Sequence, residues 1–210
     1  HYVSAPDMNM AEPEMRIFAE TIGDMKSCTG KPADMGGIPH ELGSTGFGVF
    51  HATKVACEHL GLDLKDVTFA VEGFGNVGWF VSKYMTEAGA KLVAVSDSRG
   101  VIFDENGLDF EKLVSAKNEK RTVTEYEGGK VLPSHEIKTI NADILITAAV
   151  PDLINAGDVD EMNYKIIVEG SNIPMIHEVE ESFHKKGVLI VPDFVANSGG
   201  VISSYVEYTK

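Results

Sequence analysis

Basic residues are scarce in this chain of 210 residues. Lysine and arginine number 18 against 32 aspartates and glutamates, which gives a formal net charge of -14 at pH 7. Nucleic acids and anionic membranes attract basic patches, so this balance argues against both as partners. No apolar run approaches the ~20 residues that a membrane span requires, and no signal peptide is visible. The sequence therefore predicts a cytoplasmic protein with an acidic, solvated surface.

Cysteine is rare as well, and no residues are spaced as a metal site or a hydrolase requires. The two cysteines, Cys28 and Cys57, form no metal-ligand or redox motif, and the seven histidines show no H-E-x-x-H or other paired spacing. Ser198 lies in Asn-Ser-Gly-Gly and not in the G-x-S-x-G elbow of hydrolases. We therefore predict no metal ion, and thiols that stay reduced in the cytoplasm.

The most informative stretch is residues 67–97. An apolar run at 67–72, rich in β-branched and aromatic residues, predicts a buried strand that leads directly into Gly73-Phe74-Gly75-Asn76-Val77-Gly78. A helical pattern follows, and a second apolar strand at 92–95 ends on Ser96-Asp97. Strand, glycine turn, helix, strand and an acid about 20 residues on are the parts of the dinucleotide-binding fingerprint.

Each part of this fingerprint has a physical task. Gly73 allows the tight turn, Gly75 lets the backbone approach a pyrophosphate, and Gly78 lets the helix pack closely on the strand. The free N–H groups at the start of the helix favour a phosphate. Asp97 can accept hydrogen bonds from a ribose diol. The alternative is a glycine turn that only closes a βα unit, but all five parts in order favour a cofactor.

Apolar periodicity outside this stretch completes the prediction of the fold. It predicts helices near 13–25, 49–60, 109–118, 177–186 and 201–208, and strands at 101–103, 142–149, 165–169 and 188–191. An Asn-Gly pair predicts a hairpin turn at 104–107. This alternation is typical of an α/β, Rossmann-like, doubly wound and mostly parallel sheet with helices on both faces. Because ligands bind beyond the carboxyl ends of such strands, one crevice should be ringed by Gly73, Asp97, Ala149, Asn172 and Asn197.

Several motifs also carry a family resemblance. They are Gly73-Phe-Gly-Asn-Val-Gly78, Val93-Ala-Val-Ser-Asp97-Ser, Glu169-Gly-Ser-Asn172 and Pro192-Asp-Phe-Val-Ala-Asn197-Ser-Gly-Gly-Val201. In this order they resemble the cofactor domain of glutamate dehydrogenases, within the Glu/Leu/Phe/Val dehydrogenase superfamily. Ala5-Pro-Asp7 and Ser44-Thr45-Gly46 also fall where that family has matching motifs. The resemblance covers nearly the whole chain.

The resemblance implies a site and a reaction. Residues 30–210 would form the dinucleotide-binding domain, and residues 1–29 an interdomain helix segment at the edge of a missing substrate domain. The reaction would be oxidative deamination of L-glutamate to 2-oxoglutarate and ammonia, with Asp7 as the catalytic proton-transfer group and Ser204 bound to the substrate's side-chain carboxylate. The positions that match cofactor-binding residues are Thr45, Gly73, Phe74, Gly75, Asn76, Val77, Asp97, Ser98, Ala148, Ala149, Asn172 and Asn197.

Departures from the family pattern leave alternatives open. The family's catalytic lysine, its long closing helices and an arginine near His40 are absent. We therefore expect a domain that is inactive alone, cut from a homo-oligomeric enzyme that is a hexamer by resemblance. Asp97 tilts the cofactor from NADP towards NAD, although Arg99 can accept a 2′-phosphate. A leucine-, phenylalanine- or valine-type dehydrogenase and a catalytically silent dinucleotide-binding module are the alternative functions.

Overall fold

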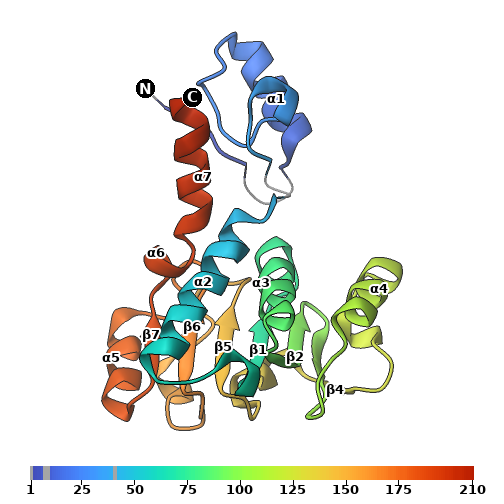
Figure 1. Ribbon diagram of the computed structural model, residues 1–210, viewed down its shortest axis with the longest axis vertical. Helices are drawn as coiled ribbons and strands as arrows, with labels where there is room; N and C mark the ends of the chain where they lie inside the picture. The colour runs from blue at the N-terminus through green and yellow to red at the C-terminus, as the bar shows by residue number, and fades with distance from the viewer. Residues whose placement is uncertain (1, 7–9, 40–41) are drawn as a thin grey trace.

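A seven-stranded sheet forms the centre of the molecule (Figure 1). The computed structural model describes residues 2–6, 10–39 and 42–210. The strands are β1 (Thr68–Glu72), β2 (Lys91–Asp97), β3 (Gly100–Phe103), β4 (Lys130–Leu132), β5 (Ile144–Thr147), β6 (Ile166–Glu169) and β7 (Leu189–Val191). Their order across the sheet is β4-β3-β2-β1-β5-β6-β7. The pairs β2–β1, β1–β5, β5–β6 and β6–β7 are parallel, whereas β3 pairs antiparallel with both β2 and β4.

Helices cover both faces of this sheet, as the sequence predicts. The α-helices of the described residues are α1 (Glu12–Ile22), which lies apart from the sheet, and α2 (Ser44–His59), α3 (Asn76–Glu87), α4 (Phe110–Lys120), α5 (His177–Lys186), α6 (Asp193–Ala196) and α7 (Ser198–Thr209). Apolar residues of α2, α3 and α4 pack in one buried cluster, and those of α5 pack in a second on the opposite face. The predicted Rossmann-like, doubly wound fold is confirmed.

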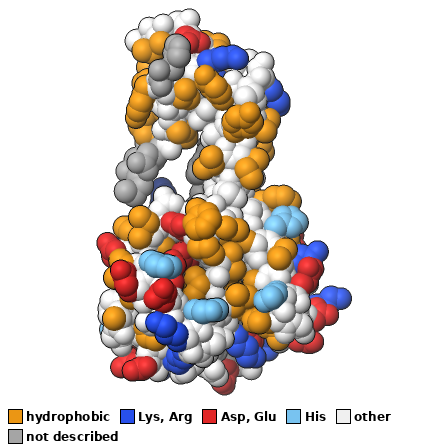
Figure 2. Space-filling view, turned by 90° about the vertical axis from the view of Figure 1, so that its left-hand side faces the viewer, with side chains coloured by type: hydrophobic (Ala, Val, Ile, Leu, Met, Phe, Trp, Pro, Cys, Tyr) orange, Lys and Arg blue, Asp and Glu red, His pale blue; other side chains and the backbone are white. Residues whose placement is uncertain are grey.

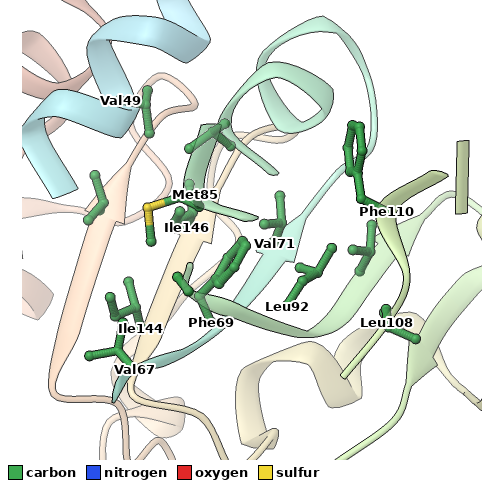
Figure 3. Close-up of a cluster of buried hydrophobic side chains, with 14 of the residues drawn as sticks. Val49, Val67, Phe69, Val71, Met85, Leu92, Leu108, Phe110, Ile144 and Ile146 are labelled. Atoms are coloured by element: carbon green, nitrogen blue, oxygen red, sulfur yellow. The ribbon is translucent and has the colours of Figure 1, made fainter. Parts of the chain in front are cut away.

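Alternate residues of each strand face opposite clusters. Phe69 and Val71 of β1 join the α2–α3 side, whereas Ala70 between them joins the α5 side. Figure 3 shows Val49 of α2 and Met85 of α3 beside the strand residues of the first cluster. Fully burying a side chain such as Phe69 stabilises the fold by about 1.5–3 kcal/mol. This packing fixes the strand register and hence the edge at which the strands end.

The predicted turn at 104–107 is present, with the N–H of Gly107 donating to the carbonyl of Asp104 (3.0 Å), but it is not the turn of a hairpin. The hairpin joins β2 to β3, with Asp97 paired to Gly100 and only Ser98 and Arg99 between them. The carboxylate of Asp97 accepts a hydrogen bond from the backbone N–H of Arg99 (2.9 Å), and this contact closes the turn. The Asn-Gly segment instead leads the chain from β3 towards α4.

The N-terminal part of the chain packs separately, beside the far end of α7 (Figure 1). Its small core consists of Met15, Ala19 and Cys28, with Phe18 and Met35 packed against them. The cluster therefore continues past residue 29, where the sequence suggests a boundary. Ser4 pairs with this segment through hydrogen bonds to the backbone of Ser27 and Thr29.

Candidate functional site

The sheet has a switch point between β1 and β5. From β1 the chain moves to β2 on one side, and it later returns to β5 on the other side of β1. Crevices that bind ligands form at such points, beyond the carboxyl ends of the strands. The buried carboxylate of Glu72, at the end of β1, accepts hydrogen bonds from the N–H groups of Ala148 (3.1 Å) and Ala149 (3.0 Å) beyond β5. Burial raises the pKa of Glu72, although these hydrogen bonds oppose the shift.

Two glycines of the turn serve the fold itself. Gly73 has a φ of 93°, and a Cβ built on it would lie 2.5 Å from the Cβ of Ala149. A Cβ on Gly78 would lie 1.9 Å from the carbonyl oxygen of Gly73. Both contacts are far closer than atoms tolerate, so these positions require glycine for the turn and for the packing of α3.

Gly75 is different, because none of its described neighbours requires it to be glycine. Its φ is -88°, which any residue adopts, and no heavy atom of the described residues lies within 4 Å of a Cβ built on it. It is the N-cap residue of α3, and no side chain caps that helix. The backbone of Gly75 at the start of α3 therefore borders open space, and the helix dipole there favours an anion. The turn fits the pyrophosphate of a dinucleotide.

The other turn residues contribute in different ways. The side chain of Phe74 is buried, and its ring lies 6.4 Å from that of Phe110, so Phe74 offers a ligand only its backbone. Val77 packs partly buried against the cluster under α2 and α3. Asn76 is the first residue of α3, next to Gly75.

Asp97 lies at the end of β2, but its carboxylate is already bound within the protein. One oxygen accepts hydrogen bonds from the N–H of Arg99 (2.9 Å) and the hydroxyl of Thr122 (3.2 Å). The other accepts from the ammonium of Lys117 (2.7 Å) and the N–H of Val123 (2.9 Å). Burial opposes ionisation, but Lys117 and the backbone donors outweigh it and hold the pKa of Asp97 below its ordinary value. Asp97 thus ties the β2–β3 turn to the segment after α4, and Ser98 and Arg99 are exposed beside it.

The starts of α2 and α7 meet near the ends of β6 and β7. Asn197, which precedes α7, donates a hydrogen bond to Asn172 beyond β6 (Nδ2 to Oδ1, 2.7 Å). A Cβ built on Gly200 would lie 2.5 Å from the hydroxyl oxygen of Thr45, so α2 and α7 are in close contact. The structure therefore brings Asn172 and Asn197 together, with Thr45 packed on the same helix start.

One predicted residue lies away from this edge, and another lies outside the described residues. Ser204 is half-buried on α7, seven positions after Asn197, or about 10 Å further along the helix at 1.5 Å per residue. Asp7, the predicted catalytic residue, lies outside the described residues, as do His40 and Glu41.

The buried carboxylates Glu72 and Glu169 are not among the site residues predicted from the sequence. Glu169, at the end of β6, is only 1% exposed; its Oε2 accepts a hydrogen bond from the N–H of Asp193 (3.0 Å), and its Oε1 has no hydrogen-bond partner among the described residues. Burial and the nearby charges of Glu180 and Asp193 raise the pKa of Glu169 to about 7. Both Glu72 and Glu169 are acidic residues at the end of an apolar strand, and this pattern could have indicated a buried carboxylate at the site.

A separate apolar groove of about 1030 Å³ lies between α2 and α7, lined by Phe47, Val55 and Ile202 among others and by none of residues 73–78. Figure 2 shows hydrophobic side chains gathered on this side of the molecule. Within residues 2–6, 10–39 and 42–210, no group of three or more His, Cys, Asp or Glu could hold a metal ion. No helix in the same ranges is long and apolar enough to cross a membrane.

The doubly wound sheet, with a glycine turn at its switch point, defines a Rossmann-type α/β domain. The sequence profile of the Glutamate/Leucine/Phenylalanine/Valine dehydrogenase family matches residues 36–210. The chain belongs to that family.

Relatives with known names agree with this assignment. The chain is 41% identical over 214 residues to a glutamate dehydrogenase of Aeropyrum pernix, covering 99% of this chain and 51% of the relative. It is 39% identical over 215 residues to that of Thermotoga maritima (99% and 52%), and 35% identical over 214 residues to an NADP-specific glutamate dehydrogenase of Saccharolobus shibatae (99% and 51%). The chain thus spans about half the length of these relatives.

Solved structures show the same coverage. A hetero-hexameric glutamate dehydrogenase of Thermus thermophilus in a leucine-bound form superposes with a TM-score of 0.88 at 26% identity, over 98% of this chain and 50% of that one. A glutamate dehydrogenase of Peptoniphilus asaccharolyticus superposes with a TM-score of 0.79 at 29% identity, over 99% and 50%.

Proposed function

We propose that this chain is the cofactor-binding half of an NAD(P)-dependent glutamate dehydrogenase. The full enzyme would oxidatively deaminate L-glutamate to 2-oxoglutarate and ammonia. Gly75 carries the proposal, because its bare backbone faces open space at an uncapped helix start and the fold itself does not require glycine there. The names of the relatives support the reaction.

Each residue would have a defined task in this reaction. The N–H groups at the start of α3 would bind the pyrophosphate, while Asn172 and Asn197, joined by their hydrogen bond, would orient the ribose and nicotinamide. A bound nicotinamide would accept the hydride from the substrate's α-carbon. The hydroxyl of Ser204 would donate to the side-chain carboxylate of glutamate, and Asp7 would take a proton from the substrate amino nitrogen.

We infer that the carboxylate of Asp97 does not itself choose between NAD and NADP. Each of its oxygens accepts two hydrogen bonds within the protein, and the ammonium of Lys117 offsets its charge. We assign selection to the exposed pair Ser98 and Arg99 in the turn that Asp97 holds. NAD and NADP both fit this arrangement.

The remaining proposals concern the whole enzyme. We infer that it works as a homo-oligomer, a hexamer by family resemblance, in the reducing cytoplasm that suits its two buried free cysteines. The present 210 residues alone would be inactive, since half of the relatives' length lies outside them. Ser204 favours glutamate over the apolar substrates of leucine-type members.

The test is a graded series at Gly75. Gly75→Ala and Gly75→Val should keep the thermal unfolding midpoint, because the backbone angle is ordinary and the space is open. Calorimetric titration should show weaker NAD(P)H binding in the alanine variant and none in the valine variant. Unchanged affinity in Gly75→Val would contradict the cofactor site. Cofactor binding without glutamate-dependent reduction of NAD or NADP in the full-length protein would instead favour a silent module.

A further inference from the structure

The most deeply buried ion pair in the described part of the chain lies at the far end of α7. Lys31 and Glu207 contact each other at 2.5 Å (Nζ to Oε1), with side chains 4% and 1% exposed. Glu207 also accepts hydrogen bonds from the backbone N–H groups of Gly30 (2.9 Å), Lys31 (3.3 Å) and Ile38 (2.7 Å). Its Oε1 and Oε2 each accept two donors, and the Lys31 ammonium also donates to the carbonyl of Cys28.

This carboxylate joins the two ends of the chain. Burial opposes ionisation, but Lys31 and the three N–H groups outweigh it and hold the pKa of Glu207 below its ordinary value. A single charged side chain therefore fixes the 28–38 loop to α7. The partners are separated by 169 to 177 positions in the sequence, so no local element would bring them together.

The loop in turn holds the peptide at residues 4–6. The N–H of Ser4 donates to the carbonyl of Ser27 (3.0 Å), and the N–H of Thr29 donates to the carbonyl of Ser4 (2.9 Å). Pro6 packs so closely on Gly30 that a Cβ there would lie 2.7 Å from the proline Cγ. Pro6 is the residue before Asp7 in the sequence. The other end of the arrangement is Ser204, one turn before Glu207 on α7.

We propose that Glu207 is a positioning residue of the dehydrogenase reaction: through Gly30, Lys31 and Ile38 it sets the place of the 4–6 peptide relative to Ser204. This inference rests on the proposed function, and it adds a residue that contacts neither substrate nor cofactor. A misplacement of about 1 Å far from the chemistry can cost about 10²-fold in rate. Loosening Glu207 should therefore slow hydride transfer and leave cofactor binding intact.

The experiment uses the full-length enzyme with L-glutamate and with glutamate deuterated at the α-carbon. Glu207→Gln keeps the shape of the side chain and removes the charge that faces Lys31. We expect kcat to fall about 10- to 100-fold, the deuterium isotope effect on kcat to rise, and the Kd for NAD(P)H to stay unchanged. Glu207→Asp keeps the charge on a shorter side chain and should show the same changes to a smaller extent. It also provides the readout if Glu207→Gln does not fold.

The matched control is Glu58→Gln, which removes an exposed partner of Lys54 on α2 (3.8 Å) and should leave all three quantities unchanged. A lower kcat with an unchanged isotope effect would mean that fewer molecules are active, and it would overturn the positioning role. An unchanged kcat would overturn it as well. If the wild-type enzyme shows no glutamate activity, the proposed function itself fails. The two failures are therefore distinguishable.

Discussion

Glu169 should make the protein less stable as the pH rises through the mildly acidic range. Its carboxyl is buried at the end of β6, and its pKa rises from the ordinary 4.5 to about 7. The folded protein therefore keeps a proton that the unfolded chain loses near pH 4.5. Because the folded state binds more protons in this window, the free energy of unfolding falls as the pH rises from about 4.5 to about 7.

The magnitude follows from the same shift. At about 1.4 kcal/mol per pKa unit, a rise from 4.5 to about 7 corresponds to about 3 kcal/mol between pH 4.5 and pH 8. Glu169→Gln stays neutral throughout, and its carbonyl oxygen can still accept the hydrogen bond from the N–H of Asp193. The variant should therefore gain about 3 kcal/mol relative to wild type between the two pH values.

Urea unfolding of both proteins at pH 4.5 and pH 8 measures this difference. Comparing the variant with wild type removes the contributions that the two proteins share, such as that of Glu72, whose pKa is also raised. Carboxylates with lowered pKa values, such as Asp97, act mainly below this window, where their stabilisation is lost as the pH falls. Glu178→Gln, on the exposed side of α5, is the control. An equal difference between wild type and Glu169→Gln at both pH values would refute the reasoning.

Three further variants test the site in the full-length enzyme. Asp97→Asn should lower the free energy of unfolding by about 1–3 kcal/mol, because a buried acceptor loses its charge. Urea unfolding measures this loss. A changed NAD/NADP preference without a loss of stability would contradict the prediction. Ser204→Val should raise the KM for glutamate about 10- to 100-fold, the effect of losing one hydrogen bond to a charged group, and steady-state kinetics with an unchanged KM would refute the substrate contact. Asp7→Asn should lower kcat about 10²–10⁴-fold while cofactor affinity stays the same; near-full turnover would leave Asp7 only a structural role.

Local patterns predicted the parts of the fold that local forces determine. The two faces of the sheet set the alternation of β1, the positive φ of the turn sets Gly73, and the carbonyl of Gly73, five positions earlier, sets Gly78. The β2–β3 hairpin was missed because its loop, Ser98-Arg99, lacks the Asn-Gly or Asp-Gly pair typical of two-residue hairpins, and the carboxylate of Asp97 closes that turn.

Other features depend on residues that are distant in sequence. Asp97 was predicted from its position after a strand, yet its donors Lys117, Thr122 and Val123 lie 20 to 26 positions later, and no local pattern shows that they fill its carboxylate. The contact of Glu207 with Gly30 spans 177 positions. Composition and spacing do not indicate such distant pairs. The sequence therefore predicts where a polar group lies, but not whether other residues of the protein already occupy its hydrogen-bonding positions.

The α7 helix connects the sheet domain, where it begins, to the 28–38 loop, which Glu207 contacts near its end. Its base rests against α2, where Gly200 leaves room for the side chain of Thr45. Its 12 residues span about 18 Å, so a tilt of about 5° at the base moves the tip by about 1.5 Å. A single methyl group added at residue 200 would thus be amplified into a displacement of Glu207 and of the loop that it binds. We therefore expect the residue at position 200 to affect the position of Glu207 at the far end of α7.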